Sequence, residues 1–237
     1  MSNNEIIENE EQADFTEQDS GSNAPSGLNL FVDKIKVWLN AQNKILVFGV
    51  GAAIVAVLGF ISYQYLYKMP REKEGLAAIF KTQELFDNDS FRLVLKDAPK
   101  LADKYSGTKA GELAEYMAGV SYLYTGDFKK AQDFLAGVDF NDQVMQFQAI
   151  GLLGDAQVEN KDLESGLKNY LKAAKGAENE FSIIWWSKKA ARIYEKKNEW
   201  KQALDIYEDL KKDYKENEGM QDIDKYIARA QAKIGEY

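Results

Sequence analysis

The stretch AGVSYLYTGDFKKAQDFL, residues 118–135, decides the fold of this chain. It contains two small residues, an aromatic residue, a Gly-Asp turn, a second aromatic residue, an alanine and a leucine. Residues 153–170 and 190–207 repeat this pattern in register, with substitutions. The equivalent positions Ala131, Gly166 and Ala203 are 35 and 37 residues apart. A period of this length is typical of a repeated pair of helices.

Each residue type in the pattern has a packing role. Small residues allow the two helices of a pair to approach closely, and an apolar residue after the turn fills the space beneath it. One pair cannot cover its own apolar face, so successive pairs stack into a solenoid. The pattern resembles the tetratricopeptide consensus, although the consensus tryptophan is replaced and no proline closes a repeat. The replacing residues are Glu115, Ile150 and Ser187.

The whole region after Pro70 is expected to be helical, with short turns and no strand. A proline here either ends a preceding helix or starts the next one. The first two of these helices are expected to form a further, degenerate pair, and the last to cap the solenoid. The helices are predicted at 71–87, 90–104, 108–125, 128–137, 143–159, 163–175, 180–197, 200–215 and 220–235.

Composition excludes several classes of function. The 237 residues carry a net charge of −8 and contain no histidine and no cysteine. Thiol nucleophiles, Cys/His zinc sites and Ser-His-Asp catalysis are therefore unavailable. The signs of charge alternate along the helical region, which does not favour nucleic-acid binding. An enzyme would need carboxylates, Lys, Ser or Tyr alone, and no such cluster is visible. The sequence predicts no catalytic residue, metal site or cofactor.

The run ILVFGVGAAIVAVLGFISYQYLY, Ile45 to Tyr67, contains no charged residue. As a helix it extends roughly 34 Å, enough to cross a ~30 Å hydrocarbon core. We therefore predict a single uncleaved membrane anchor within an all-α chain. The expected segments are an acidic disordered tail at 1–27, an amphipathic interfacial helix at 28–43, a transmembrane helix at 44–68 and a tetratricopeptide-like domain at 69–237.

Two sets of residues are candidate contact sites. Small residues in the apolar run would let another membrane helix approach closely; they are Gly49, Ala52, Ala53 and Ala56. The inner face of such a solenoid is lined by the first helix of each pair and is a common place for protein binding. Its candidates here are Tyr116, Val120, Leu123, Gln148, Asp155, Trp185, Lys188 and Arg192.

The layout and the segment Ala102–Thr108, with sequence ADKYSGT, resemble the bacterial YfgM-like family, as does the segment Val37–Lys44, with sequence VWLNAQNK. The resemblance implies an accessory subunit of the SecYEG translocon in the inner membrane, with a PpiD-like periplasmic chaperone as a further partner. It also implies a cytoplasmic N-terminus and periplasmic repeats. Charge alone leaves the direction open, because three bases flank each end of the apolar run. The alternative is an adaptor or import receptor with its repeats on the cytoplasmic side.

Overall fold

The structure is a computed structural model that describes residues 27–41 and 44–235. Most of the predicted acidic tail lies outside these residues. The chain divides into two units, residues 1–60 and 61–237, which are described in turn.

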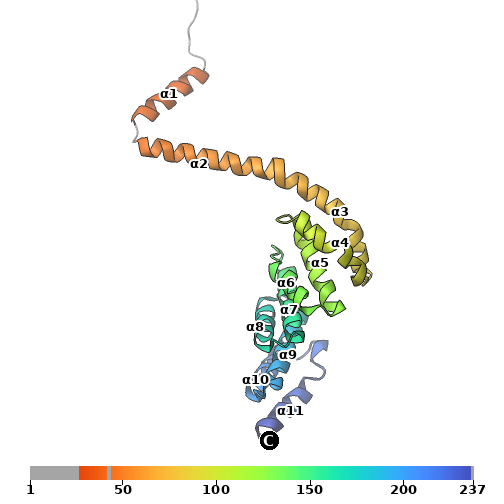
Figure 1. Cartoon of the computed structure of the whole chain (residues 1–237). Coiled ribbons are helices and arrows are strands. Elements are labelled where there is room, and N and C mark those ends of the chain that lie inside the picture. Colours follow the sequence, from red (N-terminus) through yellow and green to blue (C-terminus); the bar gives the residue numbers. More distant parts are fainter. Residues whose placement is uncertain (1–26, 42–43, 236–237) are drawn as a thin grey trace, which may run out of the picture. The chain divides into compact units, whose positions relative to one another are not determined.

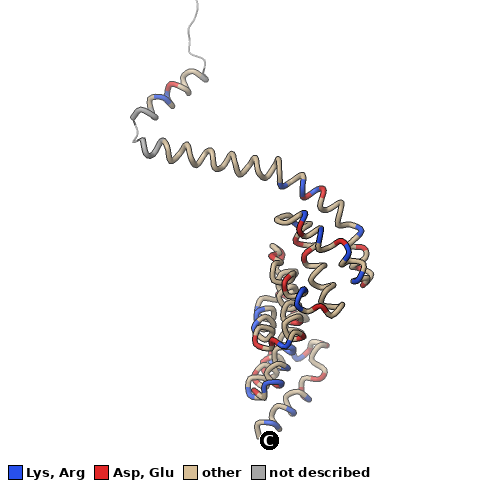
Figure 2. The backbone as a smooth tube through the Cα atoms, in the orientation of Figure 1, with Lys and Arg blue, Asp and Glu red and all other residues tan. Residues whose placement is uncertain are grey.

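The first unit contains two helices, α1 (Gly27–Ala41) and most of α2 (Lys44–Tyr63). In α1, the exposed apolar residues Leu30, Phe31 and Ile35 recur at helical spacing. Every side chain of α2 from Phe48 to Phe60 is exposed, and the helix carries no charge over this length (Figure 2). By length and composition, the helical run Phe48–Asp87 is suited to cross a membrane.

This helical run passes through Pro70 without stopping. A π-helical turn, η1 (Gln64–Lys68), separates α2 from α3 (Met69–Asp87). At the end of this turn the Met69 N–H donates to the Gln64 carbonyl, five residues back. Pro70 itself has no N–H and lies in the first turn of α3, where such a donor is least needed. Pro70 therefore lies at the start of α3 within a helical run that continues from α2, and the expectation that it ends the preceding helix is wrong.

The second unit is a succession of helices that each pack against the next along the chain (Figure 1). We call α3/α4, α5/α6, α7/α8 and α9/α10 the helix pairs. All the described elements are helical, so the predicted all-α fold, with an apolar helix before the repeats, is confirmed. After α3 the elements are α4 (Phe91–Lys104), α5 (Lys109–Thr125), α6 (Phe128–Gly137), α7 (Gln143–Glu159), α8 (Leu163–Gly176), α9 (Glu180–Lys196), α10 (Trp200–Tyr214), η2 (Glu218–Met220) and α11 (Ile223–Ile234).

The turn inside each pair contains one residue with a left-handed backbone. Its φ is 53° at Asp89, 88° at Gly126, 71° at Lys161 and 60° at Asn198. These positions follow one another at intervals of 37, 35 and 37 residues, so α3/α4 has the same turn as the other three pairs. The first pair is therefore a true member of the repeat. In three of the four turns, a residue other than glycine adopts a conformation that glycine adopts at lower cost.

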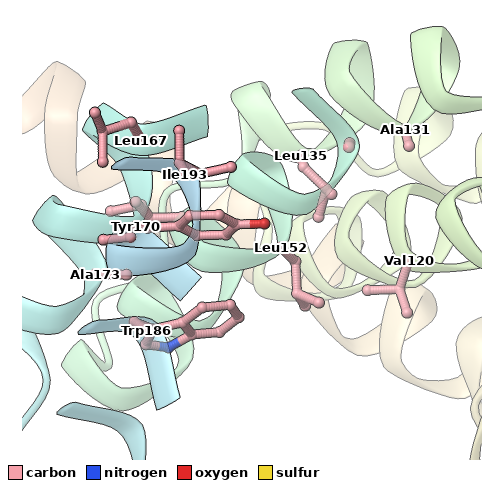
Figure 3. Close-up of a cluster of buried hydrophobic side chains, with 12 residues drawn as sticks. Val120, Ala131, Leu135, Leu152, Leu167, Tyr170, Ala173, Trp186 and Ile193 are labelled. Atoms are coloured by element: carbon pink, nitrogen blue, oxygen red, sulfur yellow. The ribbon is translucent and has the colours of Figure 1, made fainter. Parts of the chain in front are cut away.

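Close contact within the pairs depends on small residues, as expected. A Cβ atom at Gly154 would lie 2.8 Å from the Tyr170 ring and 3.2 Å from the Gly166 carbonyl oxygen. At Gly119, a Cβ atom would lie 2.7 Å from Leu135. Ala131, Ala191 and Ala203 are fully buried at the corresponding contacts. In the central core, Tyr170 and Trp186 stack at 5.9 Å between ring centroids, so that α8 packs against α9 (Figure 3).

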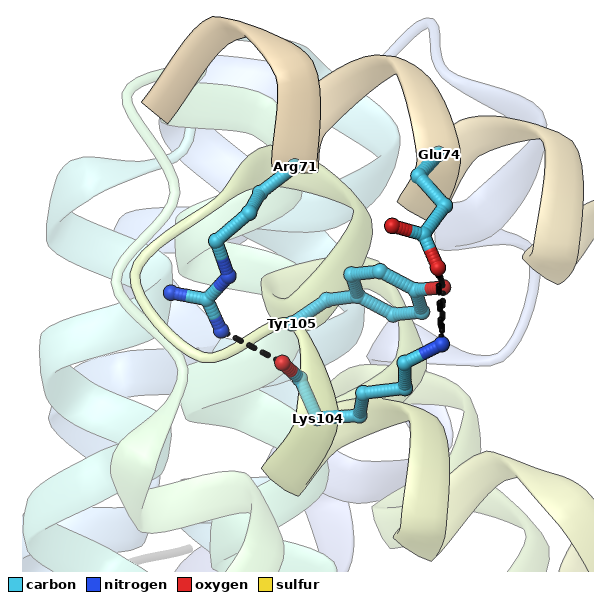
Figure 4. A network of polar contacts seen from close by, with 4 residues as sticks. All are labelled: Arg71, Glu74, Lys104 and Tyr105. Atoms are coloured by element: carbon cyan, nitrogen blue, oxygen red, sulfur yellow. Dashed lines mark hydrogen bonds and ion pairs between the residues drawn. The ribbon is translucent and has the colours of Figure 1, made fainter. Parts of the chain in front are cut away.

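Helix α3 is held by the turn between α4 and α5 (Figure 4). Lys104 and Tyr105 donate to Glu74 Oε1 at 2.8 and 2.9 Å, and Arg71 donates to the Lys104 carbonyl. The bond from Lys104 lowers the pKa of the Glu74 carboxyl. Beneath these bonds, the buried Tyr105 ring packs against Gly75. The segment 102–108, which is one of the segments that carry the family resemblance, therefore contains the residues that hold α3 in place. We call this segment the α3 socket.

Replacing Lys161 by glycine is expected to stabilise the protein by about 0.5–1 kcal/mol, because it relieves a left-handed residue at a modest entropic cost. The matched substitution Lys168→Gly lies inside α8, on its exposed side. It should lower the free energy of unfolding by about 1 kcal/mol. Urea denaturation of the full chain in detergent, followed by circular dichroism, measures both. An equal loss of unfolding free energy in the two variants would contradict the conclusion that Lys161 adopts a left-handed conformation at a cost in stability.

Candidate functional site

Two adjoining hollows lie on the side of the repeat unit formed by the first helices of the pairs. The α5–α9 hollow, of about 520 Å³, is lined from α5, α7 and α9, with single residues from α6 and α8. The α9–α11 hollow, of about 240 Å³, lies between α9 and the segment Asn217–Tyr226. Lys189 and Arg192 line both hollows. Helix α9 is therefore the shared wall of the two hollows.

The spacing of residues in α9 explains why it serves as this wall. Its apolar residues point into two cores: Trp186 and Ile193 into one, Ile184 and Ala191 into the other. The remaining stripe recurs every three or four residues, which places its members on one helix face. It consists of Phe181, Trp185, Lys188, Arg192 and Lys196.

A carboxylate hub joins the third and fourth pairs. Lys189 Nζ on α9 lies 2.6 and 2.8 Å from the two oxygens of Asp155 on α7. Tyr170 on α8 donates to the same carboxylate at 2.5 Å. Burial and the Asp155 charge raise the pKa of the Tyr170 hydroxyl well above its ordinary value. The hydroxyl therefore remains a donor at all physiological pH values. This hub ties three consecutive helices together.

A second hub repeats the arrangement one pair further on. Glu195 on α9 accepts from Tyr207 on α10 at 3.1 Å and from Arg229 on α11 at 2.6 and 2.7 Å. Burial and the Glu195 charge raise the pKa of Tyr207. In both hubs the cation follows the carboxylate by 34 residues. Asp155 and Glu195 are thus neutralised within the protein.

The cations of the α9 stripe have no such partner. Lys188 donates to the Gly219 carbonyl and Arg192 donates to the Tyr226 hydroxyl at 3.2 Å. Both acceptors are uncharged. Within residues 27–41 and 44–235, no carboxylate forms an ion pair with Lys188, Arg192 or Lys196. The stripe therefore presents positive charge beside exposed aromatic rings.

The structure brings together five of the eight predicted contact residues. Leu123, Asp155 and Arg192 line the α5–α9 hollow, and Arg192 joins Trp185 and Lys188 at the α9–α11 hollow. Asp155 is engaged in its hub.

The other three predicted contact residues line neither hollow. Val120 is buried in the central core. Tyr116 is half-buried between the rings of Phe86 and Phe140, at centroid distances of 6.2 and 5.6 Å. Gln148 is half-buried on α7.

Phe181, Lys189 and Tyr226 are among the lining residues of the α9–α11 hollow that were not predicted. Phe181 lies four residues before Trp185 and could have been found by extending the helical spacing. Tyr226 lies 34 residues after Arg192, one repeat later, in the helix expected to cap the solenoid. Helical spacing did not place Lys189 on the predicted inner face, and only the fold brings Asp155 beside it.

The candidate membrane contacts lie together on α2. Gly49, Ala52, Ala53 and Ala56 are all exposed in the described structure. Apart from its chain neighbours and the nearby backbone of its own helix, no described residue lies within 4 Å of a Cβ atom built at Gly49. Over the same described residues, no group of three or more Asp and Glu side chains is placed to hold a metal ion.

The comparisons with known proteins support the repeat architecture. A family model described as a tetratricopeptide repeat-like domain matches residues 36–184. The match begins before the apolar helix and continues into α9, so it includes both the apolar helix and three of the four pairs. No curated protein matches the chain.

Removing either side of the Asp155 hub is expected to destabilise the protein. Asp155→Asn or Lys189→Met should each lower the free energy of unfolding by about 1–3 kcal/mol, because each leaves a partly buried polar group without its partner. The double variant should lose less than the sum of the two. Lys188→Met, on the adjacent residue, should change stability by less than about 0.5 kcal/mol. Urea denaturation of the full chain measures the free energy of unfolding of all four variants. If the loss in the double variant equalled the sum of the two single losses, the result would argue against the hub.

Proposed function

The chain belongs to the tetratricopeptide repeat-like domain family, and we propose that it is a membrane-anchored, non-enzymatic scaffold that binds protein partners. Repeat domains of this class are typically protein-interaction modules without catalytic activity. The α9 stripe is the observation that carries the proposal. Phe181 and Trp185 are 68% and 49% exposed and stack at 6.1 Å between ring centroids. Exposed aromatic residues beside arginine are typical of protein-binding surfaces.

The proposed anchor is the helix formed by Ile45–Tyr67. Its composition, its length and the exposure of its described side chains support this assignment. The preceding helix α1 carries exposed apolar residues together with Lys34 and Lys36, a combination that favours a position in the membrane interface. Gly49, Ala52, Ala53 and Ala56 are the proposed contacts with a partner helix in the membrane.

The finer proposal is that this protein is an accessory subunit of the Sec protein translocon in the bacterial inner membrane. Its N-terminus would be cytoplasmic, and its repeats would be periplasmic, near SecYEG and a PpiD-like chaperone. The resemblance to YfgM-like proteins supports this proposal, and the α3 socket gives a structural role to residues 102–108, one of the segments that carry it. The repeats would recruit a partner or contact emerging chains. The alternative is a cytoplasmic adaptor or import receptor.

The direction of the anchor can be tested by protease protection. In sealed, right-side-out spheroplasts, added protease should digest the repeat unit and leave a protected N-terminal fragment that ends near Lys68. A periplasmic control protein should be digested and a cytoplasmic one spared. Protection of the repeats in spheroplasts, together with their digestion in inverted vesicles, would favour the cytoplasmic adaptor and contradict the periplasmic assignment.

The binding surface can be tested with a photo-crosslinking amino acid. Placed at Trp185 in the full chain in membranes, it should crosslink a translocon or chaperone subunit. Placed at Lys168, an exposed α8 position that lines neither hollow, it should give at most background crosslinking. Mass spectrometry identifies the products. Equal yields from both positions, or no protein product from Trp185, would contradict the proposal.

A further inference from the structure

We propose that the α9–α11 hollow binds an extended partner segment in which a large apolar side chain stands next to an Asp or Glu side chain. This inference rests on the proposed function and specifies the ligand of one part of its surface. It follows from three features of the hollow: an exposed aromatic wall, two cations without carboxylate partners, and continuity with the neighbouring hollow.

The aromatic wall would hold the apolar side chain. Phe181 and Trp185 stack with an angle of 13° between their rings, and both side chains are exposed. Ile184, 3% exposed, lines the same hollow between them in sequence. Burying these ring faces against an apolar side chain stabilises a complex by removing that surface from water.

The cationic wall would hold the carboxylate. Lys188 and Arg192 lie one helical turn apart on α9, and both also approach the ring of Tyr226, at 5.5 and 5.8 Å from its centroid. Their bonds to the Gly219 carbonyl and the Tyr226 hydroxyl fix their positions without cancelling their charge. Among the described residues that line the hollow there is no carboxylate. Lys189, the third cation of this wall, is already paired with Asp155.

A purely apolar ligand fits this hollow less well. It would cover Lys188 and Arg192 and remove them from water without a counter-charge, which is costly. A nucleic acid is also a poor fit, because Asp155, Glu159 and Glu195 interrupt the positive charge along α7 and α9. A ligand with a side-chain carboxylate beside an apolar group can pair its charge with the cationic wall and pack its apolar group against the aromatic wall.

The connection between the hollows favours an internal segment of a partner over a chain end. Lys189 and Arg192 line both hollows, so a bound chain can continue from the aromatic wall into the α5–α9 hollow. There it would meet the exposed ring of Tyr124 and the apolar side chains of Leu123 and Val158. A segment bound in this way leaves both of its ends free to continue.

The ligand class can be tested with short peptides blocked at both ends, so that no terminal charge is present. The probe contains one phenylalanine followed by one glutamate among glycines and serines. Two matched peptides replace the glutamate by glutamine or the phenylalanine by alanine. Calorimetric titration of the full chain in lipid nanodiscs should show binding of the probe, and each replacement should weaken it by about tenfold or more. Binding should also weaken as salt is raised.

Variants of the protein locate the binding. The double variant Lys188→Gln and Arg192→Gln should reduce affinity for the probe by about tenfold and make the glutamate and glutamine peptides equivalent. Trp185→Ala should weaken the binding of the glutamate and glutamine peptides by the same factor. The charge-matched control, Lys168→Gln with Lys201→Gln, alters exposed lysines outside the hollow and should leave affinity unchanged. Circular dichroism confirms that each variant is folded.

Equal binding of the glutamate and glutamine peptides to the parent protein would overturn the proposal. So would an equal loss in the control variant, or the absence of probe binding. The general function is judged separately, by crosslinking from Trp185 in membranes. If that crosslinking persists while the peptides fail to bind, the surface binds proteins but the proposed ligand class is wrong.

Discussion

In the pairs α5/α6, α7/α8 and α9/α10, the two helices approach so closely that a glycine or alanine lies where they touch, and the rest of the structure depends on this contact. At Gly154, a single added methyl group would collide with the Tyr170 ring. The small residue on one helix makes room for a large side chain of the other helix, such as Leu135 or Tyr170, which can also reach the neighbouring pair. Tyr170, for example, packs against Trp186 of the next pair. Stacking thus follows from the close packing inside each pair.

Stacking also decides which charges stay available to a partner. Asp155 is neutralised by Lys189 at the junction of the third and fourth pairs, and Glu195 is neutralised by Arg229 at the junction of the fourth pair and α11. The cations Lys188 and Arg192 bond only neutral groups of η2 and α11. The chain as a whole carries a net negative charge, yet one of its hollows is cationic. Net charge is therefore a poor guide to what this surface binds.

Much of the fold could be predicted from the sequence, because its determinants are local. Helical spacing and turn residues placed the expected helices from 71 to 235 within about three residues of the observed ones. The equivalence of the first pair was less evident from the sequence, and it is established by Asp89, which takes the left-handed position that Gly126 occupies in the second pair. The π-helical turn before Pro70 had no sequence signal, since it is a local adjustment of a continuous helix.

The site was harder to predict than the fold because adjacent residues on one helix have different surroundings. A helical count places Val120 on the inner face, but packing from α6 and α7 buries it in the core. The pair Lys188-Lys189 shows the same limit more sharply. Lys188 was predicted on the inner face and Lys189 was not, yet both line the α9–α11 hollow, and of the two only Lys189 is paired with Asp155. The difference arises from a rotation of about 100° around the helix axis. The neighbouring helices decide which residue is paired and which is left open, so a surface of this kind is a property of the stack and not of any one repeat.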